Sequence, residues 1–348
     1  MWDIRGWNRL TVNNNPPLVA ARREFLSWLA EVAEPVQTIW GGRLQSKLDH
    51  PHLSVRLELF LHHYFKHNDW SVEIEPEIPG SPNRPDFRVM HSTDMLLVEA
   101  KAILDELSIT QETTRLTQVA DDLSGKLSRY AIIEPLSDLP PSLPARRIKA
   151  QIEQHAQTQA SATLEFDLSD VHKGKRYSLR VVLLPESPDT TELRGVGGMM
   201  SGVHTLTTGK RIRDALEEKA GKYGSMDVPF VIAIYGVGHF PVLPSDELDA
   251  LCGDKVWNEQ SRSQFVERRQ PNGFFNSVRE GRHRHEGVSA VASYRFKLLE
   301  HTHVHLLHIY HNPFAVRPLN PDLFPTVPQM AMDSAGSLKW INGEPESW

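Results

Sequence analysis

Two adjacent strand-like runs with charged ends constrain the fold of this chain more than any other feature. The runs PDFRVMH (85–91) and DMLLVEAK (94–101) are separated only by Ser92 and Thr93, a gap that predicts a hairpin. The segment MLLVEAK is apolar enough to be a strand buried in the middle of a sheet. Its glutamate and lysine are costly to bury without a partner. The hairpin therefore predicts a sheet with a chemical site at one end of a central strand.

Two carboxylates and a lysine are expected to converge at that end. Successive side chains of a strand point to opposite faces, so Glu99 and Lys101 share one face. Asp86 opens the other strand and lies, in a hairpin, across from the end that carries Glu99. Hard oxygen ligands suit Mg²⁺, for which Mn²⁺ can substitute. Such an ion lowers the pKa of its bound water and offsets charge on a phosphate, so the pattern predicts a site that cuts phosphodiester bonds.

Each residue of this group has an expected role. Asp86, Glu99 and the Ala100 carbonyl are expected to bind the metal ion. Lys101 is expected to position the attacking water or to stabilise the transition state. The spacing is weakly specific by itself, and the alternative interpretation is an ordinary Glu–Lys pair at an exposed hairpin tip.

The segments on either side of the hairpin predict an α-β-β-β-α-β order. A helix over 51–67 and a strand over 71–78 precede the hairpin. A helix over 110–127 and a strand over 130–134 follow it. The Pro-rich LSDLPPSLP then breaks the chain before a further helix over 145–157.

This order, with its Pro-Asp strand and its Glu-x-Lys strand, is similar to the core of the PD-(D/E)XK nuclease superfamily. The matching residues are Pro85, Asp86, Glu99 and Lys101. The resemblance covers roughly residues 50–135 and implies an α/β, restriction-endonuclease-like core with a mixed sheet. The rest of the chain resembles a bacterial family that carries this nuclease core, through EEKAGKYGSMDVPFVIAIYG and HNPFAVRPLNPDLF. That second likeness assigns no substrate.

The resemblance implies further site residues on two helices. Many members place a glutamate on the preceding helix, and Glu58 fits that position at the margin of the apolar stripe. It is expected to be a second-metal or water-shell ligand, the alternative being a plain surface glutamate. Some members carry a glutamine in the helix after the lysine. Gln118, with Arg115 beside it, is the nearest candidate for a nucleic-acid contact, the alternative being a solvated helix residue.

The sequence predicts three regions. Residues 1–50 form a helical leader with a helix over 17–34, residues 51–157 form the nuclease core, and residues 158–348 form an α/β extension. The extension contains an amphipathic helix over 211–224. Its strand-like runs are 162–168, 177–185, 228–236, 288–296 and 303–310. The sequence leaves open whether the extension is a separate domain or continues the first sheet.

The charge balance requires a local basic surface for any nucleic-acid partner. Lysine and arginine number 38 against 44 for aspartate and glutamate, a net charge of −6 that argues against binding by bulk charge. The segment 262–285 has six arginines and two glutamates, with Phe265, Phe274 and Phe275 between them. Arginine interleaved with aromatic residues is suited to contacting phosphates and stacking on bases; the alternative is a solvated loop with buried phenylalanines. The contacts expected here are Arg268, Arg269, Arg282 and Arg284.

Other residues limit the kinds of site that the chain can build. Cys252 is the only cysteine, which excludes an intrachain disulfide and a cysteine-rich zinc site. His301, His303 and His305 are predicted on one strand face, which is expected to be exposed to solvent and to bind no metal. The sequence has neither the apolar segment of a signal peptide nor a run of about 18 apolar residues. We therefore expect no membrane contact and a cytoplasmic location.

These observations predict a divalent-metal-dependent nuclease that prefers DNA to RNA. The resemblance implies a role in defence against foreign DNA or in DNA repair. One rival is a catalytically inactive module that binds nucleic acid or protein on the same fold, although such copies usually lose one of the three catalytic residues. The other rival is an RNA-cleaving nuclease, which the catalytic residues do not distinguish because the metal acts on the phosphate alone. Whether the protein acts as a homodimer or with a partner protein is also open.

Overall fold

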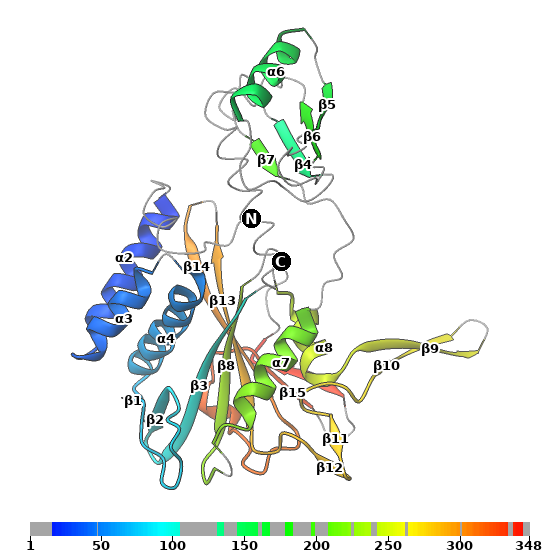
Figure 1. Ribbon diagram of the computed structural model, residues 1–348. Helices are drawn as coiled ribbons and strands as arrows, with labels where there is room; N and C mark the ends of the chain where they lie inside the picture. The colour runs from blue at the N-terminus through cyan, green and yellow to red at the C-terminus, as the bar shows by residue number, and fades with distance from the viewer. Residues whose placement is uncertain are drawn as a thin grey trace. The chain divides into compact units, whose positions relative to one another are not determined.

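A computed structural model gives the structure of the chain (Figure 1). It describes residues 16–46, 48–104, 131–135, 145–158, 162–167, 178–183, 196–198, 208–223, 226–237, 242–261, 264–299, 301–332 and 337–343. The chain folds as two compact units. The first comprises Met1–Leu104 and Thr207–Trp348, and the second, Asp105–Leu206, is inserted between these two parts. The boundaries drawn from the sequence, at 50 and 157, differ from this division.

The first unit is built on an eight-stranded mixed sheet, in the order β1-β2-β3-β8-β13-β14-β15-β16. Its strands are β1 (Ser71–Ile74), β2 (Phe87–His91), β3 (Asp94–Leu104), β8 (Phe230–Val237), β13 (Ala290–Leu298), β14 (His303–His311), β15 (Gln329–Met332) and β16 (Leu338–Ile341). Strands β1, β2 and β3 form an antiparallel meander, whereas β8 is parallel to both β3 and β13. The predicted hairpin is confirmed, with Phe87 opposite Val98. The large mixed sheet makes the protein a mixed α/β fold.

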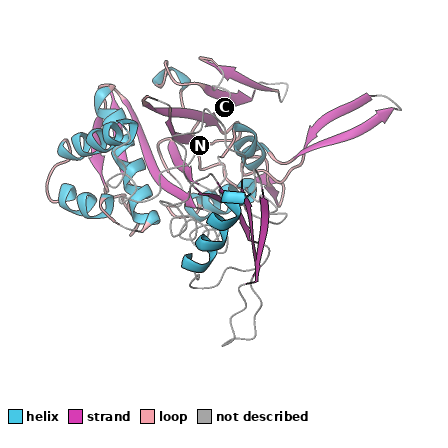
Figure 2. Cartoon of the chain, turned by 90° about the horizontal axis from the view of Figure 1, so that it is seen from above, coloured by secondary structure: helices cyan, strands magenta, loops and turns pink. Residues whose placement is uncertain are grey.

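Helices cover both faces of this sheet (Figures 1 and 2). Helices α2 (Pro16–Ala30), α3 (Val36–Leu44) and α4 (Asp49–His67) pack on the face that carries Val98. Helices α7 (Thr208–Ala220) and α8 (Pro244–Cys252) pack on the opposite face, with Leu97 and Ile103 of β3. Strand β3 is therefore buried on both faces, as its apolar run predicts. None of the helices in the described ranges is long and apolar enough to span a membrane.

The elements that complete the core around β3 differ from the prediction. The helix predicted over 110–127 lies outside the described residues, and β4 (Ala131–Pro135) belongs to another sheet. Helix α7 and strand β8 occupy the positions expected for these two elements, which gives the order α4-β1-β2-β3-α7-β8. Burial explains the difference. Strand β8 is buried on both faces, as a parallel central strand requires, whereas the side chains of β4 alternate between buried and half-buried.

The second unit has a four-stranded sheet of its own, in the order β5-β6-β4-β7. The strands other than β4 are β5 (Ala162–Asp167), β6 (Ser178–Leu183) and β7 (Val196–Gly198), and the described helix is α6 (Ala145–Thr158). Arg180 on the central strand β6 pairs with Glu134 and with Glu165, each at 2.9 Å, so it links the two neighbouring strands.

Shorter elements of the first unit lie outside the main sheet. Strands β9 (Lys255–Ser261) and β10 (Gln264–Arg269) form one hairpin, and β11 (Val278–Arg279) and β12 (Arg282–His283) form another. A short 3-10 helix, η2 (Pro321–Leu323), precedes β15. Cys252 is buried at the end of α8, where burial raises the pKa of its thiol to about 11.

A buried polar network ties α8 to the sheet. Glu247 is 1% exposed, and its side chain accepts hydrogen bonds from Ser293 Oγ, Arg295 Nη2 and Tyr310 Oη, each at 2.5 Å. Three donors offset the cost of burying one carboxylate. The position of α8 therefore depends on this network as well as on apolar packing.

We expect Arg295→Met to lower the free energy of unfolding by about 3–5 kcal/mol, because it leaves the buried Glu247 charge without its cation. The matched Ser293→Ala variant removes one neutral donor and should cost only about 1 kcal/mol. Urea denaturation followed by circular dichroism measures both. Equal losses of stability in the two variants would contradict a dominant role for the ion pair.

Candidate active site

Asp86 and Glu99 meet at the end of the β2–β3 hairpin. Asp86 immediately precedes Phe87, which pairs with Val98, so Asp86 comes opposite Glu99. The Asp86 carboxylate accepts a hydrogen bond from the Ala100 N–H at 2.6 Å. This bond fixes the Asp86 side chain against β3, beyond the last pair of the ladder.

The same bond defines the direction of the Ala100 carbonyl. The N–H and C=O of one residue in a strand point to the same edge. Because the Ala100 N–H points toward Asp86, the Ala100 C=O lies on the edge where β2 has already ended. That edge offers the carbonyl oxygen a position beside the Asp86 carboxylate, as expected for a shared ligand set.

Glu99 is buried and already has three partners. Its side chain is 1% exposed and accepts from Lys219 Nζ at 2.6 Å and Lys222 Nζ at 3.0 Å. Tyr223 donates a short hydrogen bond from its hydroxyl to the other carboxylate oxygen, and the same hydroxyl contacts the Arg84 carbonyl oxygen at 3.0 Å. Burial and the hydrogen bond to Glu99 raise the pKa of Tyr223 well above its usual range. Two ammonium groups therefore offset the charge of the central carboxylate.

Lys101 lies on the same face of β3 and points to α7. Its Nζ forms a salt bridge with Glu218 at 2.7 Å, and its side chain is 20% exposed. The hydrogen bond from Lys101 lowers the pKa of Glu218 below its usual value. The lysine expected to position water is therefore held at the edge of the site, where solvent reaches it.

Glu58 is buried on α4 and held by an arginine of α3. Its side-chain oxygens accept two hydrogen bonds from the Arg43 guanidinium, at 2.6 and 2.7 Å, and the residue is 7% exposed. Burial and the charges of Glu75 and Glu99 nevertheless raise the pKa of the Glu58 carboxyl. The alternative of a plain surface glutamate is therefore wrong.

Burial and the neighbouring carboxylates act together on Asp86. Burial, followed by the charges of Glu99 and Glu58, raises the pKa of Asp86 to about 7. The hydrogen bond from Ala100 and the charge of Lys219 act in the opposite direction without cancelling it. Asp86 therefore holds a proton more readily than an ordinary aspartate, and added positive charge would favour its loss.

The three carboxylates are close but do not form a compact ligand cluster. Two groups of histidine and glutamate in the described part of the chain have ligand atoms that all lie within 4.8 Å of one another. These are Glu24 with His303 and His305, and Glu31 with His63 and His67. Glu58, Asp86 and Glu99 do not meet that condition as a set of three. Joint binding of one ion by Asp86 and Glu99 stays a prediction.

Several site residues were missed by sequence reasoning. Lys219, Lys222 and Tyr223 follow the helical spacing i, i+3, i+4, which places them on one side of α7 and its end. Arg43 carries no comparable signal in the sequence. His50, at the start of α4, feels the charges of Lys101 and Arg43, and burial together with these charges lowers its pKa.

The residues predicted to contact nucleic acid have different places in the structure. Arg115 and Gln118, and the side chain of Arg268, lie outside the described residues. Arg269 donates to Asp249 Oδ1 and to the Gly253 carbonyl oxygen, both at 2.8 Å, so it serves to hold α8 and its end in place. Phe274 and Phe275 are 1% and 2% exposed. These two rings are therefore part of the core and do not present a stacking surface.

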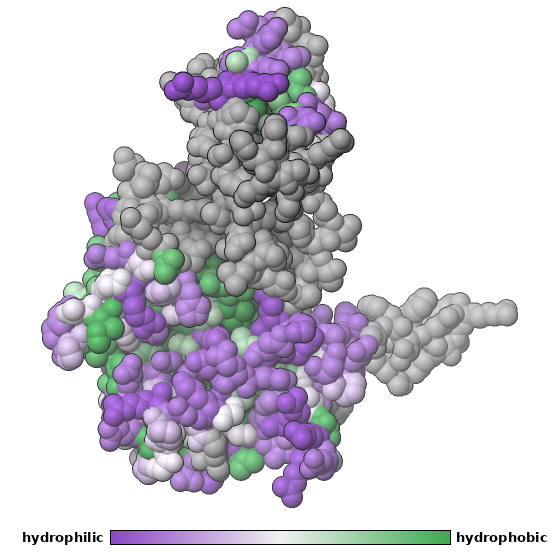
Figure 3. All heavy atoms as spheres, viewed as in Figure 1, coloured by the Kyte–Doolittle hydropathy of each residue, from purple (hydrophilic) through white to green (hydrophobic). Residues whose placement is uncertain are grey.

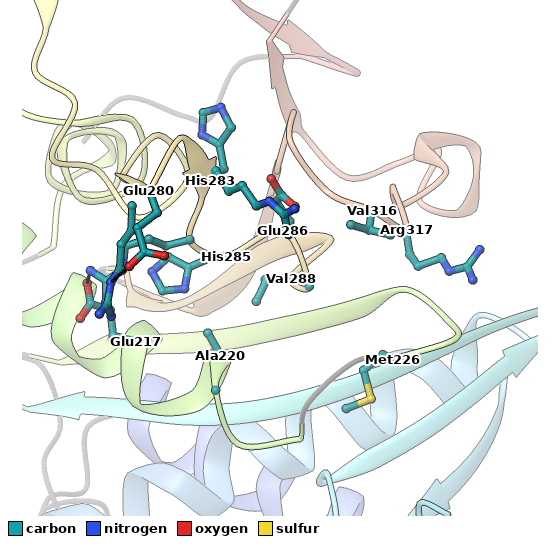
Figure 4. Close-up of a pocket in the computed structure, with 15 residues that line it drawn as sticks. Glu217, Ala220, Met226, Glu280, His283, His285, Glu286, Val288, Val316 and Arg317 are labelled. Carbon is teal, nitrogen blue, oxygen red and sulfur yellow. Dashed lines mark hydrogen bonds and ion pairs between the residues drawn. The ribbon is translucent and has the colours of Figure 1, made fainter.

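Arg282 and Arg284 line a pocket of about 650 Å³ next to α7 (Figure 4). Arg284 forms a salt bridge with Glu217 at 3.3 Å. Figure 4 shows Glu217 and Ala220 of α7 along one side and His283, His285 and Glu286 along another. The charged residues of the lining are Glu217, Arg279, Glu280, Arg282, Arg284, Glu286 and Arg317. Hydrophilic side chains also gather over α7 and the β11–β12 hairpin in Figure 3.

No protein-family model, curated protein or solved structure matches this chain. The structure itself shows a mixed α/β protein with a carboxylate-rich group at the end of a central strand. The superfamily resemblance rests on the residues that carry it and stays a prediction.

We expect the Asp86 carboxyl of the metal-free protein to titrate near pH 7, and Glu99→Gln to lower its pKa. The substitution removes a repelling charge and leaves Lys219 and Lys222 to act on Asp86. Carbon-13 NMR of the labelled carboxyl measures the titration. Glu73→Gln, at an exposed position of β1, is the control that should leave the Asp86 pKa unchanged.

The same shift has a consequence for stability. A raised pKa means that the folded chain binds this proton more tightly than the unfolded chain. The contribution of Asp86 to stability is therefore present at low pH and lost as the pH rises through about 7. An Asp86 pKa near the ordinary value of about 4, or one that Glu99→Gln leaves unmoved, would contradict the proposed repulsion.

Proposed function

We propose that this protein is a divalent-metal-dependent nuclease that hydrolyses phosphodiester bonds. The observation that carries the proposal is the burial of Asp86 beside Glu99 and Glu58; burial first, and then the two neighbouring charges, raise the pKa of Asp86 to about 7. Carboxylates that repel one another at a strand end are relieved by a divalent cation, and hard oxygen ligands favour Mg²⁺ or Mn²⁺.

The arrangement of elements gives further support. The order α4-β1-β2-β3-α7-β8 corresponds to the α-β-β-β-α-β core that the superfamily resemblance implies. Asp86 stands before β2, and Glu99 and Lys101 stand on β3, the positions that the Pro-Asp and Glu-x-Lys strands require. A restriction-endonuclease-like core is thus part of the proposal.

The donor set fits a hard cation. Asp86, Glu99 and the Ala100 carbonyl would hold the ion, and Glu58, which Arg43 already holds, would act in its water shell. When bound, Mg²⁺ or Mn²⁺ lowers the pKa of water and offsets charge on the phosphate. Lys101, fixed by Glu218 at the rim of the site, would orient the attacking water. Lys219 and Lys222 add positive charge on the side where the phosphate must approach.

The arginine-lined pocket supports a polyanionic substrate. Glu217 lines the pocket and Lys219 contacts Glu99, so α7 lies between the pocket and the carboxylates. Residues two apart on a helix point to nearly opposite sides. A nucleic acid that crosses α7 could contact Arg282 and Arg284 with one phosphate and the carboxylate site with another. DNA is the preferred substrate class, and defence or DNA repair is the role that the resemblance implies.

An inactive binding module on the same fold is the second candidate. It is favoured by the observation that Lys219, Lys222 and Tyr223 already satisfy Glu99. In that function the lysines would replace the metal ion, and the arginine-lined pocket would bind nucleic acid without cleavage. Metal dependence of cleavage separates the two functions.

We expect Lys101→Met to reduce the rate of DNA cleavage by at least about 100-fold, because it removes a cation that acts in the transition state. Plasmid nicking in Mg²⁺ or Mn²⁺ measures the rate, and EDTA should abolish it. Lys210→Met is the matched control, since Lys210 is an exposed lysine of α7 that pairs with Asp214 in the same helix.

Two results would argue against the nuclease. Cleavage that persists in EDTA, or that survives Lys101→Met, would refute the mechanism. Binding of DNA or RNA without any cleavage would favour the binding module. Cleavage of RNA alone would keep the chemistry and replace the substrate class.

We expect Arg282→Gln to weaken binding of DNA and to reduce the slope of log K against log salt by about 1, the effect of losing one phosphate contact. Fluorescence anisotropy at several salt concentrations measures the slope. Arg23→Gln, an exposed arginine of α2 on the opposite face of the sheet, should leave it unchanged. Equal slopes for the unchanged protein, Arg282→Gln and Arg23→Gln would show that the pocket is not part of the DNA-binding surface.

A further inference from the structure

The histidines of β14 are packed under a helix. The sequence predicted that they would face solvent. His303 and His305 side chains are 10% and 12% exposed because α2 packs over this part of the strand. His301 precedes β14 and is exposed, so it does not share their face. The expectation of an exposed row of three histidines was wrong because the sequence did not reveal what covers the strand.

Two imidazoles and one carboxylate converge between α2 and β14. His305 Nε2 lies 3.0 Å from Glu24 Oε2, and His303 Nε2 makes a short hydrogen bond with the same oxygen. The ligand atoms of the three side chains all lie within 4.8 Å of one another. Ligand atoms of a tetrahedral zinc ion are about 3.4 Å apart at bond lengths near 2.1 Å. Small side-chain movements would therefore admit an ion.

We propose that Glu24, His303 and His305 form a binding site for a divalent transition-metal ion of the Zn²⁺ class. Imidazole nitrogen favours zinc, cobalt or nickel, whereas Mg²⁺ prefers a site made only of oxygen ligands. Two histidines and one glutamate also leave a fourth position for water. The site therefore differs in ligand chemistry from the carboxylate group beside β3.

The surroundings hold one of these ligands in a fixed orientation. The Nδ1 atom of His305 lies 2.8 Å from the Tyr294 hydroxyl, which belongs to the neighbouring strand β13. The His305 ring also packs against Phe25, Trp28 and Phe60. A hydrogen bond at the second ring nitrogen is the usual way in which proteins orient a metal-bound histidine.

The position of the site indicates a structural role. Glu24 is on the first described helix, whereas His303 and His305 are near the start of β14, 279 and 281 residues further along the chain. An ion would join α2 to the main sheet on the face opposite α7. This role is independent of phosphodiester cleavage.

A second histidine group, between the end of α2 and helix α4, serves as an internal comparison. Glu31, the residue directly after the end of α2, lies 3.2 Å from His63 Nδ1. The His67 side chain is 57% exposed, and its Nδ1 contacts the His63 carbonyl oxygen at 3.0 Å. That nitrogen is thus engaged by its own helix, so this group is the weaker ligand set.

The test is metal binding by the full chain after removal of metals, in an Asp86→Asn background that weakens the carboxylate site. We expect one Co²⁺ per chain with visible absorption bands typical of imidazole ligation, and displacement by Zn²⁺ but not by Mg²⁺. Zinc at a hundredfold excess over its dissociation constant should raise the midpoint of thermal unfolding by about 5 °C.

Two variants and one control locate the site. Glu24→Gln, at a half-exposed position, and His303→Gln should each weaken metal binding more than tenfold. Loss of a group that only hydrogen-bonds to a metal ligand already costs about 10-fold or more in metal affinity. Glu31→Gln is the matched control and should bind normally. Far-UV circular dichroism of each variant checks the fold. Absence of stoichiometric binding, or loss of binding in Glu31→Gln but not in Glu24→Gln, would overturn the proposal.

Discussion

The burial of one carboxylate, Glu99, is the constraint on which the rest of the first unit depends. A charge on a strand covered on both faces is stable only with cations that reach it from a neighbouring element. Lys219 of α7 and Lys222, in the turn directly after it, supply them, so α7 must cross this face of the sheet. The crossover then brings in β8 parallel to β3, and the eight-stranded sheet is built outward from that pair.

Local patterns predicted the parts of this arrangement that are close in sequence. The β2–β3 hairpin, the helix before it and the placement of Asp86 opposite Glu99 follow from alternation and a two-residue turn. The partners of Glu99 did not follow, because Lys219 is 120 residues away and a whole unit intervenes. The sequence placed β4 in the nuclease core because β4 follows β3 closely along the chain. In the structure that position is filled by β8, which comes after the inserted unit. Strand β8 is buried on both faces, whereas the side chains of β4 alternate between buried and half-buried.

The candidate site shows the same division between what was and was not predictable. The place of Asp86 opposite Glu99 was inferable from the hairpin, whereas the hydrogen bonds from Arg43 to Glu58 depend on how two helices pack. Exposure was the property most often misjudged from sequence. The β14 histidines lie under α2, and Arg269 serves α8, because tertiary packing decides which polar side chains remain at the surface.

The insertion of residues 105–206 separates β3 from the lysines that neutralise it, and this separation has a consequence during synthesis. A nascent chain emerging from the ribosome completes the β1–β3 meander long before Lys219 and Lys222 are made. Until then, Glu99 has no cation from α7, so the meander cannot bury that face at low cost. The first unit should consequently assemble late, after the inserted unit has left the ribosome, with α7 arriving as the element that allows the sheet to close.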